Sequence, residues 1–375
     1  MRRNFLLQTA IIMLNALAWI GSVRADIVIG LATPMTGGMA WFGEQHQQAL
    51  AAAAPELEAA ERAIGEAIRT IVVDDFCDGE QAVAAAQKLV KSGALFVGGH
   101  ACSGAAIPAS AVYDDAGILM IASTATNPAL TERGFELVFR VVERDTKQAA
   151  MVADRLAERG AERRIAIVHD GEAYGQGLAE ATRDFLSERR VEPIIFEEVE
   201  PGRADYGDLL DQLAATRIDV LFFSGYPTEA GLVVRRARER GQGFEMIGVD
   251  SLASEYFWHM AGDAAEGVVF PSTKELRGSP AAASVVARFR AQGFEPEGFT
   301  LYNFAVFEVW SQAVQKAGTA DPETVARTLR DNTFDTVLGT IGFDARGDVT
   351  GYDSFAWYIW QDGEYVPLEP ASRKE

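Results

Sequence analysis

Two segments of the sequence place glycine and small hydroxyl residues directly after an apolar run of the kind that forms a buried strand. They are Gly98–Pro108 and Ser123–Pro128. At the carboxyl ends of parallel strands, such turns are where open α/β sheets bind their ligands. A helix that begins at Ser103 would present unpaired N–H groups and the positive end of its dipole, which suits a carboxylate. The two turns together therefore predict a binding site for a small anionic group.

Three hydroxyl residues in these turns, Ser103, Thr124 and Thr126, are candidate ligand contacts. The same residues also have a purely structural interpretation, because serine often caps a helix and threonine often shapes a turn. Their spacing alone leaves both interpretations open.

An acid and several aromatic residues stand where other strands are expected to end. The acid is Asp250, and the aromatic candidates are Phe42, Tyr174, Tyr226, Phe299 and Tyr302. These types suit the capture of an amino acid, because the acid can pair with the α-ammonium group while the rings enclose the side chain. Taken singly, a residue such as Tyr226 or Phe299 fits the hydrophobic core at least as well.

The motifs of the common enzyme classes are absent from the sequence. There is no G-x-S-x-G, G-x-x-x-x-G-K-[ST] or H-E-x-x-H, and Gly175–Gly177 lacks the third glycine of a dinucleotide site. His100 and His169 follow predicted strands, but such histidines more often form local hydrogen bonds. Asp74 and Asp75 follow another strand, where aspartate more often caps the next helix. We therefore expect a binding protein without a cofactor, and an α/β hydrolase is the alternative from another class.

The elements that would position these residues alternate along the chain. From Asp26 onward, strands such as Ile27–Leu31 alternate with helices such as Glu80–Lys91, and the alternation begins again near Lys147. Strands that alternate with helices of about 10–15 residues imply parallel sheets with helices on both faces. After Pro271 the pattern changes to alanine-rich helices, which must cover an apolar face.

Two late strands, Thr340–Phe343 and Phe355–Trp360, flank the turn Ala345–Asp348, whose Arg-Gly-Asp sequence we interpret as part of a hairpin. Two successive blocks of strands and helices predict two lobes joined by several crossovers. The cleft between the lobes is then the expected ligand site.

Length and charge limit the class of partner. The 375 residues are enough for two domains with separate cores, and the formal net charge is −20 at pH 7. So much negative charge repels phosphate backbones and anionic lipid, so we expect neither nucleic acid nor a membrane surface as a partner.

The first 25 residues have the pattern of a secretory signal peptide. Arg2 and Arg3 precede an apolar run from Phe5 to Ile20, and Val23–Ala25 supplies small residues before a cleavage point at Asp26. No later apolar run approaches the length of a membrane span. These features predict an exported protein of the bacterial periplasm that does not insert into the membrane.

The sequence contains only two cysteines, Cys77 and Cys102. In an oxidising compartment, a single pair most simply forms one disulfide, and each cysteine follows a predicted strand. Two cysteines and four scattered histidines make a zinc site improbable, so we expect no metal.

The mature chain resembles the periplasmic solute-binding proteins for branched-chain amino acids, over nearly its whole length. The segments that carry the resemblance are Asp74–Val83, Gly99–Ser103, Pro108–Ser110, Gly117–Ile121, Arg164–Asp170 and Tyr174–Ala179. The resemblance implies an α/β type I periplasmic binding protein fold, with two Rossmann-like lobes joined by three hinge crossovers. It also implies that Cys77 and Cys102 are bonded. The expected N-terminal lobe is 26–144 with 274–352, and the expected C-terminal lobe is 145–273 with 353–375.

The resemblance also assigns roles to residues of the expected cleft. The carboxylate-binding serine and threonine fall on Ser103 and Thr126, and the acid that pairs with the ammonium falls on Asp250, which replaces the usual glutamate. The residue whose carbonyl accepts from the ammonium is Thr124, where alanine is usual. The aromatic wall falls on Phe42, Tyr174, Tyr226 and Phe299, and Trp41 lies beside it.

Together these observations predict an extracytoplasmic receptor that captures an α-amino acid, branched-chain or otherwise aliphatic, and delivers it to an inner-membrane ABC permease. We expect a monomer. The same fold with another small ligand, such as an amide, a urea or an aromatic acid, is the nearest alternative, and the acid Asp250 argues against it.

Overall fold

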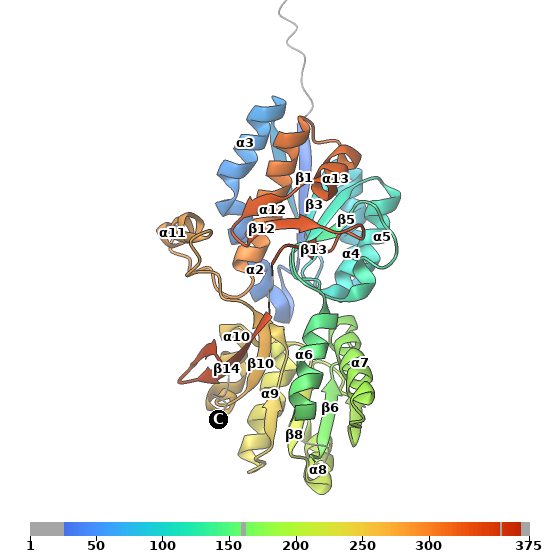
Figure 1. The fold of residues 1–375 in the computed structure, drawn as a ribbon, viewed down its shortest axis with the longest axis vertical. Helices are drawn as coiled ribbons and strands as arrows, with labels where there is room; N and C mark the ends of the chain where they lie inside the picture. Colours follow the sequence, from blue (N-terminus) through green and yellow to red (C-terminus); the bar gives the residue numbers. More distant parts are fainter. Residues whose placement is uncertain (1–25, 159–162, 353–354, 369–375) are drawn as a thin grey trace, which may run out of the picture.

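The computed structural model describes residues 26–158, 163–352 and 355–368. The predicted signal peptide lies outside these residues. Within them, two lobes lie one above the other, each built on its own sheet (Figure 1). The predicted α/β fold of two Rossmann-like lobes is confirmed.

The first lobe contains a parallel sheet of strand order β2-β1-β3-β4-β5. Its strands are β1 (Ile27–Thr33), β2 (Ile68–Asp74), β3 (Ala94–Gly99), β4 (Leu119–Ala122) and β5 (Val138–Arg140). All seven residues of β1 are buried, as expected for a strand that is covered on both faces. The turns that follow these strands therefore open at one edge of the sheet, towards the second lobe.

Helices from two distant parts of the sequence cover this sheet. The early ones are η2 (Gly37–Met39), α2 (Ala40–Ala52), α3 (Ala54–Ile64), α4 (Gly79–Lys91), α5 (Ser103–Asp115) and η3 (Pro128–Leu130), and the late ones are α11 (Ala283–Ala291), α12 (Thr300–Ala317) and α13 (Pro322–Asp331). Pro55 lies in the first turn of α3, and Gly65 ends that helix at φ +68°, a left-handed conformation that favours glycine. Trp310 of α12 stacks on Phe96 of β3 at 4.8 Å, which ties the late helices to the core of the first lobe.

The second lobe contains a sheet of order β15-β14-β10-β9-β8-β6-β7. Its strands are β6 (Ile165–His169), β7 (Ile195–Glu198), β8 (Val220–Ser224), β9 (Glu245–Ile247), β10 (Val269–Thr273), β14 (Phe355–Gln361) and β15 (Glu364–Pro367). Its helices are α6 (Asp145–Glu158), α7 (Ala173–Glu188), α8 (Gly207–Thr216), α9 (Pro227–Glu239), η4 (Asp250–Leu252), α10 (Glu255–Ala261) and η5 (Gly262–Ala265). Separate apolar cores lie on the two faces of this sheet, one against α6 and α7 and the other against α8, α9 and α10.

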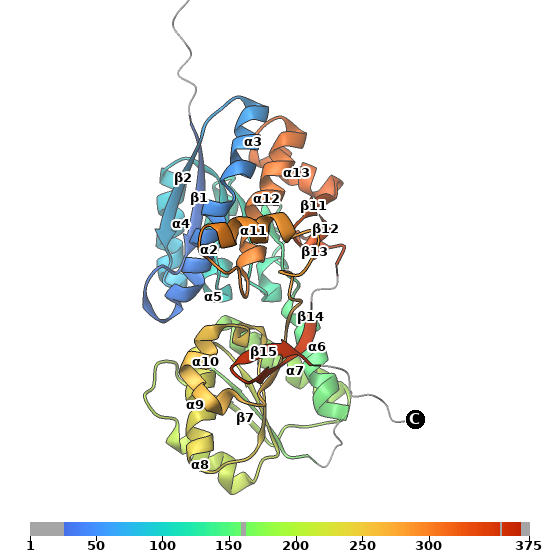
Figure 2. The ribbon, with the colours of Figure 1, turned by 90° about the vertical axis from the view of Figure 1, so that its left-hand side faces the viewer.

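The chain passes between the lobes three times, from β5 to α6, from β10 to α11 and from β13 (Val349–Thr350) to β14. The crossovers from β5 to α6 and from β10 to α11 run along one side of the molecule (Figure 2). One detail of the sequence interpretation needs correction. The Arg-Gly-Asp turn joins β12 (Gly339–Phe343) to β13, in a small sheet completed by β11 (Phe334–Thr336), whereas β14 pairs antiparallel with β10 in the second lobe.

The predicted disulfide is present. Cys77, in the turn after β2, is bonded to Cys102, which precedes α5, with 5.4 Å between their Cα atoms. The bond fixes two turns at the edge of the first sheet that faces the second lobe. Among the residues that the structure describes, no helix is both long enough and apolar enough to cross a membrane.

Candidate ligand site between the two lobes

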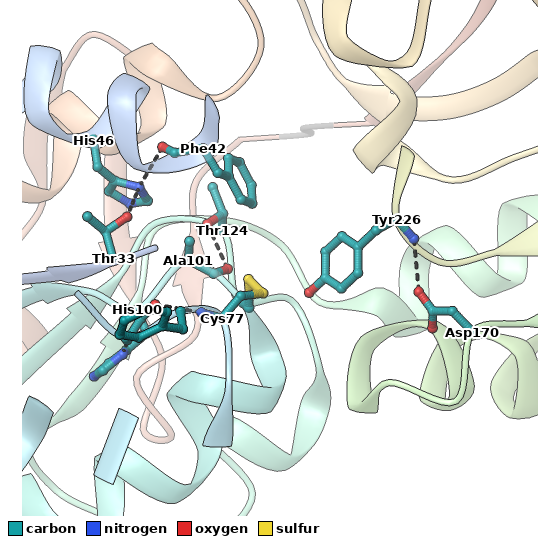
Figure 3. Close-up of a disulfide and its surroundings, with 12 residues drawn as sticks. Thr33, Phe42, His46, Cys77, His100, Ala101, Thr124, Asp170 and Tyr226 are labelled. Carbon is teal, nitrogen blue, oxygen red and sulfur yellow. Dashed lines mark hydrogen bonds and ion pairs between the residues drawn. A yellow bond between two sulfur atoms is a disulfide. The ribbon is translucent and has the colours of Figure 1, made fainter. Parts of the chain in front are cut away.

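A small cavity lies between the lobes, at the carboxyl ends of their parallel strands. The first lobe lines it with Phe42, Ala101, Ser103, Thr124 and Phe299, and the second lobe with Tyr174, Tyr226, Asp250 and Ser251. Seven of the nine predicted ligand residues are thus together, although they come from seven separate segments of the chain. Figure 3 shows Tyr226 extending from the second lobe towards Ala101 and Thr124 of the first.

The end of the cavity at α5 is suited to an anion. Ser103 is the first residue of α5, and its Oγ accepts a hydrogen bond from the amide of Asn127 at 3.3 Å. Within the described part of the chain, no acceptor takes the Ser103 hydroxyl proton, so that proton can be donated into the cavity. The N–H groups of the first helical turn and the helix dipole add to the attraction for a negative group.

The opposite end presents lone pairs, because its hydroxyl protons are directed away from the cavity. Ser251 Oγ donates to the carbonyl of Gly225 at 2.7 Å, and on the first-lobe side Thr124 Oγ1 donates to the carbonyl of Ala101 at 2.9 Å. The Tyr174 hydroxyl donates to Oδ1 of Asp250. A hydroxyl that has donated its proton can only accept a further hydrogen bond. These groups are therefore arranged for a ligand that donates, such as an ammonium.

Asp250 is the acidic group of this end, and it is 2% exposed. Its Oδ1 also accepts from Nε2 of Gln148 at 3.1 Å, and its amide donates to Oε1 of Gln148 at 2.8 Å. Burial raises the pKa of Asp250, against the opposing effect of the hydrogen bonds from Tyr174 and Gln148. A buried carboxylate with a raised pKa gains most when a positive charge arrives beside it.

A second acid, Asp145, lies close to Asp250 and was not identified from the sequence. Burial raises the pKa of Asp145 to about 8, and the negative charge of Asp250 adds to the effect. Neither of its carboxylate oxygens has a hydrogen-bond partner among the described residues, and neither has the hydroxyl of Thr126. The Thr126 hydroxyl favours the ionised form of Asp145 but lies outside hydrogen-bond geometry. The signal in the sequence was the acid and amide three residues apart, Asp145 and Gln148, in the first turn of a helix.

Thr126 and Trp41, the two remaining predicted ligand residues, do not line the cavity. Thr126 is buried behind it, 1% exposed. Trp41 stacks on Phe42 at 4.6 Å and on Tyr256 of the second lobe at 5.8 Å, and it lines a neighbouring groove. It therefore supports the aromatic wall from outside. Tyr302 also lies outside the cavity, packed in the core against Phe299.

Arg140 holds the turn that carries Thr126. Its guanidinium donates to the carbonyls of Ala125 and Asn127, both at 3.0 Å, and to Oδ1 of Asp348 at 2.6 Å. Arg140 is fully buried, so its charge depends on Asp348 for compensation. The two carbonyls fix the orientation of the backbone between them.

The histidines near the cavity are parts of the core. His100 bonds Asp75 at 2.6 Å and the hydroxyl of Tyr113 at 3.0 Å, with no exposed surface. His46 bonds Oγ of Ser123 at 2.7 Å and is 1% exposed; burial lowers its pKa to about 4. Figure 3 shows both rings on the first-lobe side of the cavity. Since the serine that bonds a histidine is buried, these contacts do not form an accessible nucleophile.

The model of the periplasmic binding protein family matches residues 26–363, which is most of the chain. The chain belongs to the periplasmic binding protein family. An amino acid binding protein of Pseudomonas aeruginosa is 38% identical over 348 residues, which cover 92% of this chain and 93% of that protein. The leucine-, isoleucine-, valine-, threonine- and alanine-binding protein of the same organism is 34% identical, with 90% and 91% of the two chains covered.

Solved structures of other periplasmic binding proteins share the fold. A substrate-binding protein of an ABC transporter from Desulfitobacterium hafniense, solved with leucine, is 26% identical with a TM-score of 0.73, and covers 92% of this chain and all of that one. A leucine-binding protein from Thermotoga maritima is 22% identical with a TM-score of 0.81, and covers 92% and 98%. The predicted family and the type I periplasmic binding protein fold are thus confirmed.

Proposed function

We propose that this protein captures an α-amino acid between its two lobes and delivers it to the permease of an ABC importer, without bond chemistry. The observation that carries the proposal is the polarity of one cavity. A helix N-terminus and the Ser103 proton lie on the first-lobe side, with Thr124 beside Ala101 on the same side, and Asp250 with the lone pairs of Tyr174 and Ser251 lies on the second-lobe side. These two sides match the carboxylate and the ammonium of a zwitterion.

The roles follow from this polarity. Ser103 and the turn of Thr126 bind the carboxylate, while Asp250 and Thr124 bind the ammonium. The rings of Phe42, Tyr174, Tyr226 and Phe299 enclose the ligand side chain. An aliphatic side chain, branched or short, suits such a wall, and relatives with that preference support the assignment.

Ligand-driven closure is the proposed mechanism. The first lobe comprises 26–144 and 274–352, and the second 145–273 and 353–375, a division supported by the strand order of the two sheets. Residues 353–354 and 369–375 lie outside those that the structure describes. Because contacts to both lobes exist only when the cleft is closed, a bound amino acid shifts the population towards the closed form.

The proposed location is the periplasm, reached after cleavage between Ala25 and Asp26, and the proposed state is a monomer. The family and the pattern of residues 1–25 in the sequence support the location. The net charge of −20 is consistent with a partner other than nucleic acid.

A thermal-shift screen of the common amino acids against the mature protein tests the proposal. A ligand at about a thousand times its dissociation constant stabilises the folded state by about 4 kcal/mol, which raises the melting temperature by several degrees. We expect aliphatic amino acids to give the largest shifts, with titration calorimetry confirming one site per chain. If no amino acid raises the melting temperature, the proposed function is wrong.

A further inference from the structure

Three exposed apolar side chains gather at one corner of the first lobe. Within the described residues, four large hydrophobic side chains are exposed, and three of them are Met35, Val72 and Phe76, with 37%, 37% and 52% of their surfaces accessible. Phe76 follows β2, Met35 follows β1, and Thr33 of β1 pairs with Asp74 of β2 at the carboxyl ends of these strands. The corner is therefore on the edge of the lobe that faces the cleft. In Figure 2, the blue loop that leads into α2 lies at this edge, on the side away from the crossovers.

The carboxylate of Asp74 connects the loops that follow β1 and β2 at this corner. Oδ1 of Asp74 accepts hydrogen bonds from the amides of Met35 at 2.9 Å and of Phe76 at 3.0 Å, and its Oδ2 accepts from the hydroxyl of Thr36 at 2.7 Å. Although burial opposes the effect, these bonds lower the pKa of Asp74, so it remains charged at neutral pH. Met35 and Phe76 are thus neighbours in a fixed arrangement rather than two unrelated exposed residues.

The backbone at Phe76 is held in a conformation that bulky residues rarely adopt. Phe76 has φ +56° and Cys77 has φ +58°, in the left-handed region that disfavours large side chains. The disulfide to Cys102 and the hydrogen bond from the Cys77 amide to Asp75 hold this turn. A strained turn that displays a phenylalanine to solvent, rather than burying it, is characteristic of a contact surface.

Carboxylates of both lobes lie near this corner, and one lysine, Lys88 of α4, also acts on Asp74 there. Asp74, Asp78 and Glu80 lie beside Phe76 in the sequence, and Asp78 caps α4. Across the cleft, the carboxylate of Glu172 lies against Gly104 in the first turn of α5, and Gly104 lies against Gly79, the neighbour of Asp78. Burial raises the pKa of Glu172, and the negative charges of Asp78 and Glu229 add to the effect. Charges of like sign from the two lobes therefore come together at this corner when the cleft is closed. An apolar centre with an acidic rim is complementary to an apolar surface bordered by lysine and arginine.

We propose that Met35, Val72 and Phe76, with the acidic rim around them, form the docking surface for the extracytoplasmic face of the ABC permease, which would present apolar side chains bordered by basic ones. The inference rests on the proposed transport function. Since the rim includes carboxylates of both lobes, its complete charge pattern forms only in the closed protein. The permease would thus recognise the loaded form.

Two substitutions on this docking surface and one matched control test the proposal. Phe76→Asn removes the ring and places at φ +56° a residue that tolerates this conformation, so folding is preserved. Met35→Gln replaces the second apolar side chain at similar length. Ile194→Asn is the control, because Ile194 is the fourth exposed apolar residue, 47% accessible, and precedes β7 next to the amino end of β6, at the far edge of the second lobe from the cleft.

The measurement is uptake of the radiolabelled amino acid that gives the largest thermal shift, by cells of the source organism that carry each variant in place of the chromosomal copy. At saturating amino acid, we expect uptake in Phe76→Asn and in Met35→Gln to fall by about tenfold or more, because such anchors dominate an interface. Uptake in Ile194→Asn should equal that of the wild type. Amino acid affinity of all three purified proteins, measured by calorimetry, should be unchanged.

Each contrary outcome identifies a different error. Wild-type uptake in the Phe76→Asn, Met35→Gln double variant, with binding intact, would overturn the docking surface and leave the proposed function standing. Loss of amino acid binding in these variants would assign the corner to ligand capture instead. A wild-type dimer in analytical ultracentrifugation that dissociates in Phe76→Asn would assign it to self-association. If uptake does not depend on the wild-type protein, the transport function itself is wrong.

Discussion

Replacing Asp250 by asparagine isolates the charge on which the proposed ammonium site depends. Asparagine has nearly the same shape, and its carbonyl oxygen can accept the hydrogen bonds that Tyr174 and Gln148 donate to Oδ1 of Asp250. Its amide group would replace the other carboxylate oxygen and would point N–H donors at the ligand. The substitution therefore removes one negative charge and one acceptor without creating a cavity.

The expected cost follows from burial. Asp250 is 2% exposed, so a bound ammonium beside it is largely removed from water. Breaking a buried charge pair by removing one partner costs about 3–5 kcal/mol. Because about 1.4 kcal/mol corresponds to a tenfold change in affinity, the dissociation constant should rise by roughly a hundredfold to a few thousandfold.

The same substitution should not destabilise the free protein. Burial raises the pKa of Asp250, which means that the folded state disfavours the charged carboxylate at neutral pH. Asparagine carries no such penalty, so the melting temperature of the ligand-free variant should equal or exceed that of the wild type. Affinity and stability are thus expected to move in different directions, which separates a binding defect from a folding defect.

Titration calorimetry with the preferred amino acid and a thermal melt without ligand provide the two measurements. Glu308→Gln is a matched control, because burial also raises the pKa of Glu308, to about 7, and its carboxylate accepts from the amide of Val337 in the first lobe. Its affinity for the amino acid should be unchanged. Unchanged affinity in Asp250→Asn would remove this acid from the site and refute the reasoning from the polarity of the cavity.

Three further outcomes are expected. Binding should release protons near pH 7, seen as a calorimetric enthalpy that varies with the buffer, because the ammonium would lower the pKa of Asp145, which burial raises to about 8 in the free protein. The free protein should lose stability as the pH rises from the unfolded pKa of the carboxyl, about 4, towards 8, and Asp145→Asn should diminish both effects. Replacing Cys77 and Cys102 by serine should lower the free energy of unfolding by about 3 kcal/mol in a denaturant titration, because the bond closes a loop with a sequence separation of 25 residues. Asp348→Ala should cost about 3–5 kcal/mol of stability by the same measurement, since it leaves the buried charge of Arg140 without its partner, and a loss within the error of the titration would contradict the assignment.

The sequence could predict the fold because its signals are local. Alternating apolar strands and amphipathic helices identify parallel sheets, and Pro55 and Gly65 mark the two ends of α3. The strand-end residues Ser103 and Asp250 could also be selected, because all carboxyl ends of a parallel sheet meet at one edge. Their chemistry suggested an amino acid, and the resemblance to a family assigned each residue its role.

Contacts between distant segments decided the rest. Gln148 forms hydrogen bonds with Asp250, and Asp145 interacts with the same carboxylate. The sequence alone did not reveal these contacts, since Gln148 and Asp250 are 102 positions apart. It could not place Trp41 outside the cavity, because the face that a helical residue presents depends on what packs against it. The composition thus determined which chemical groups were available at the strand ends. The tertiary structure decided which way their protons point, and with that the charge of the ligand group that each end of the cavity can hold.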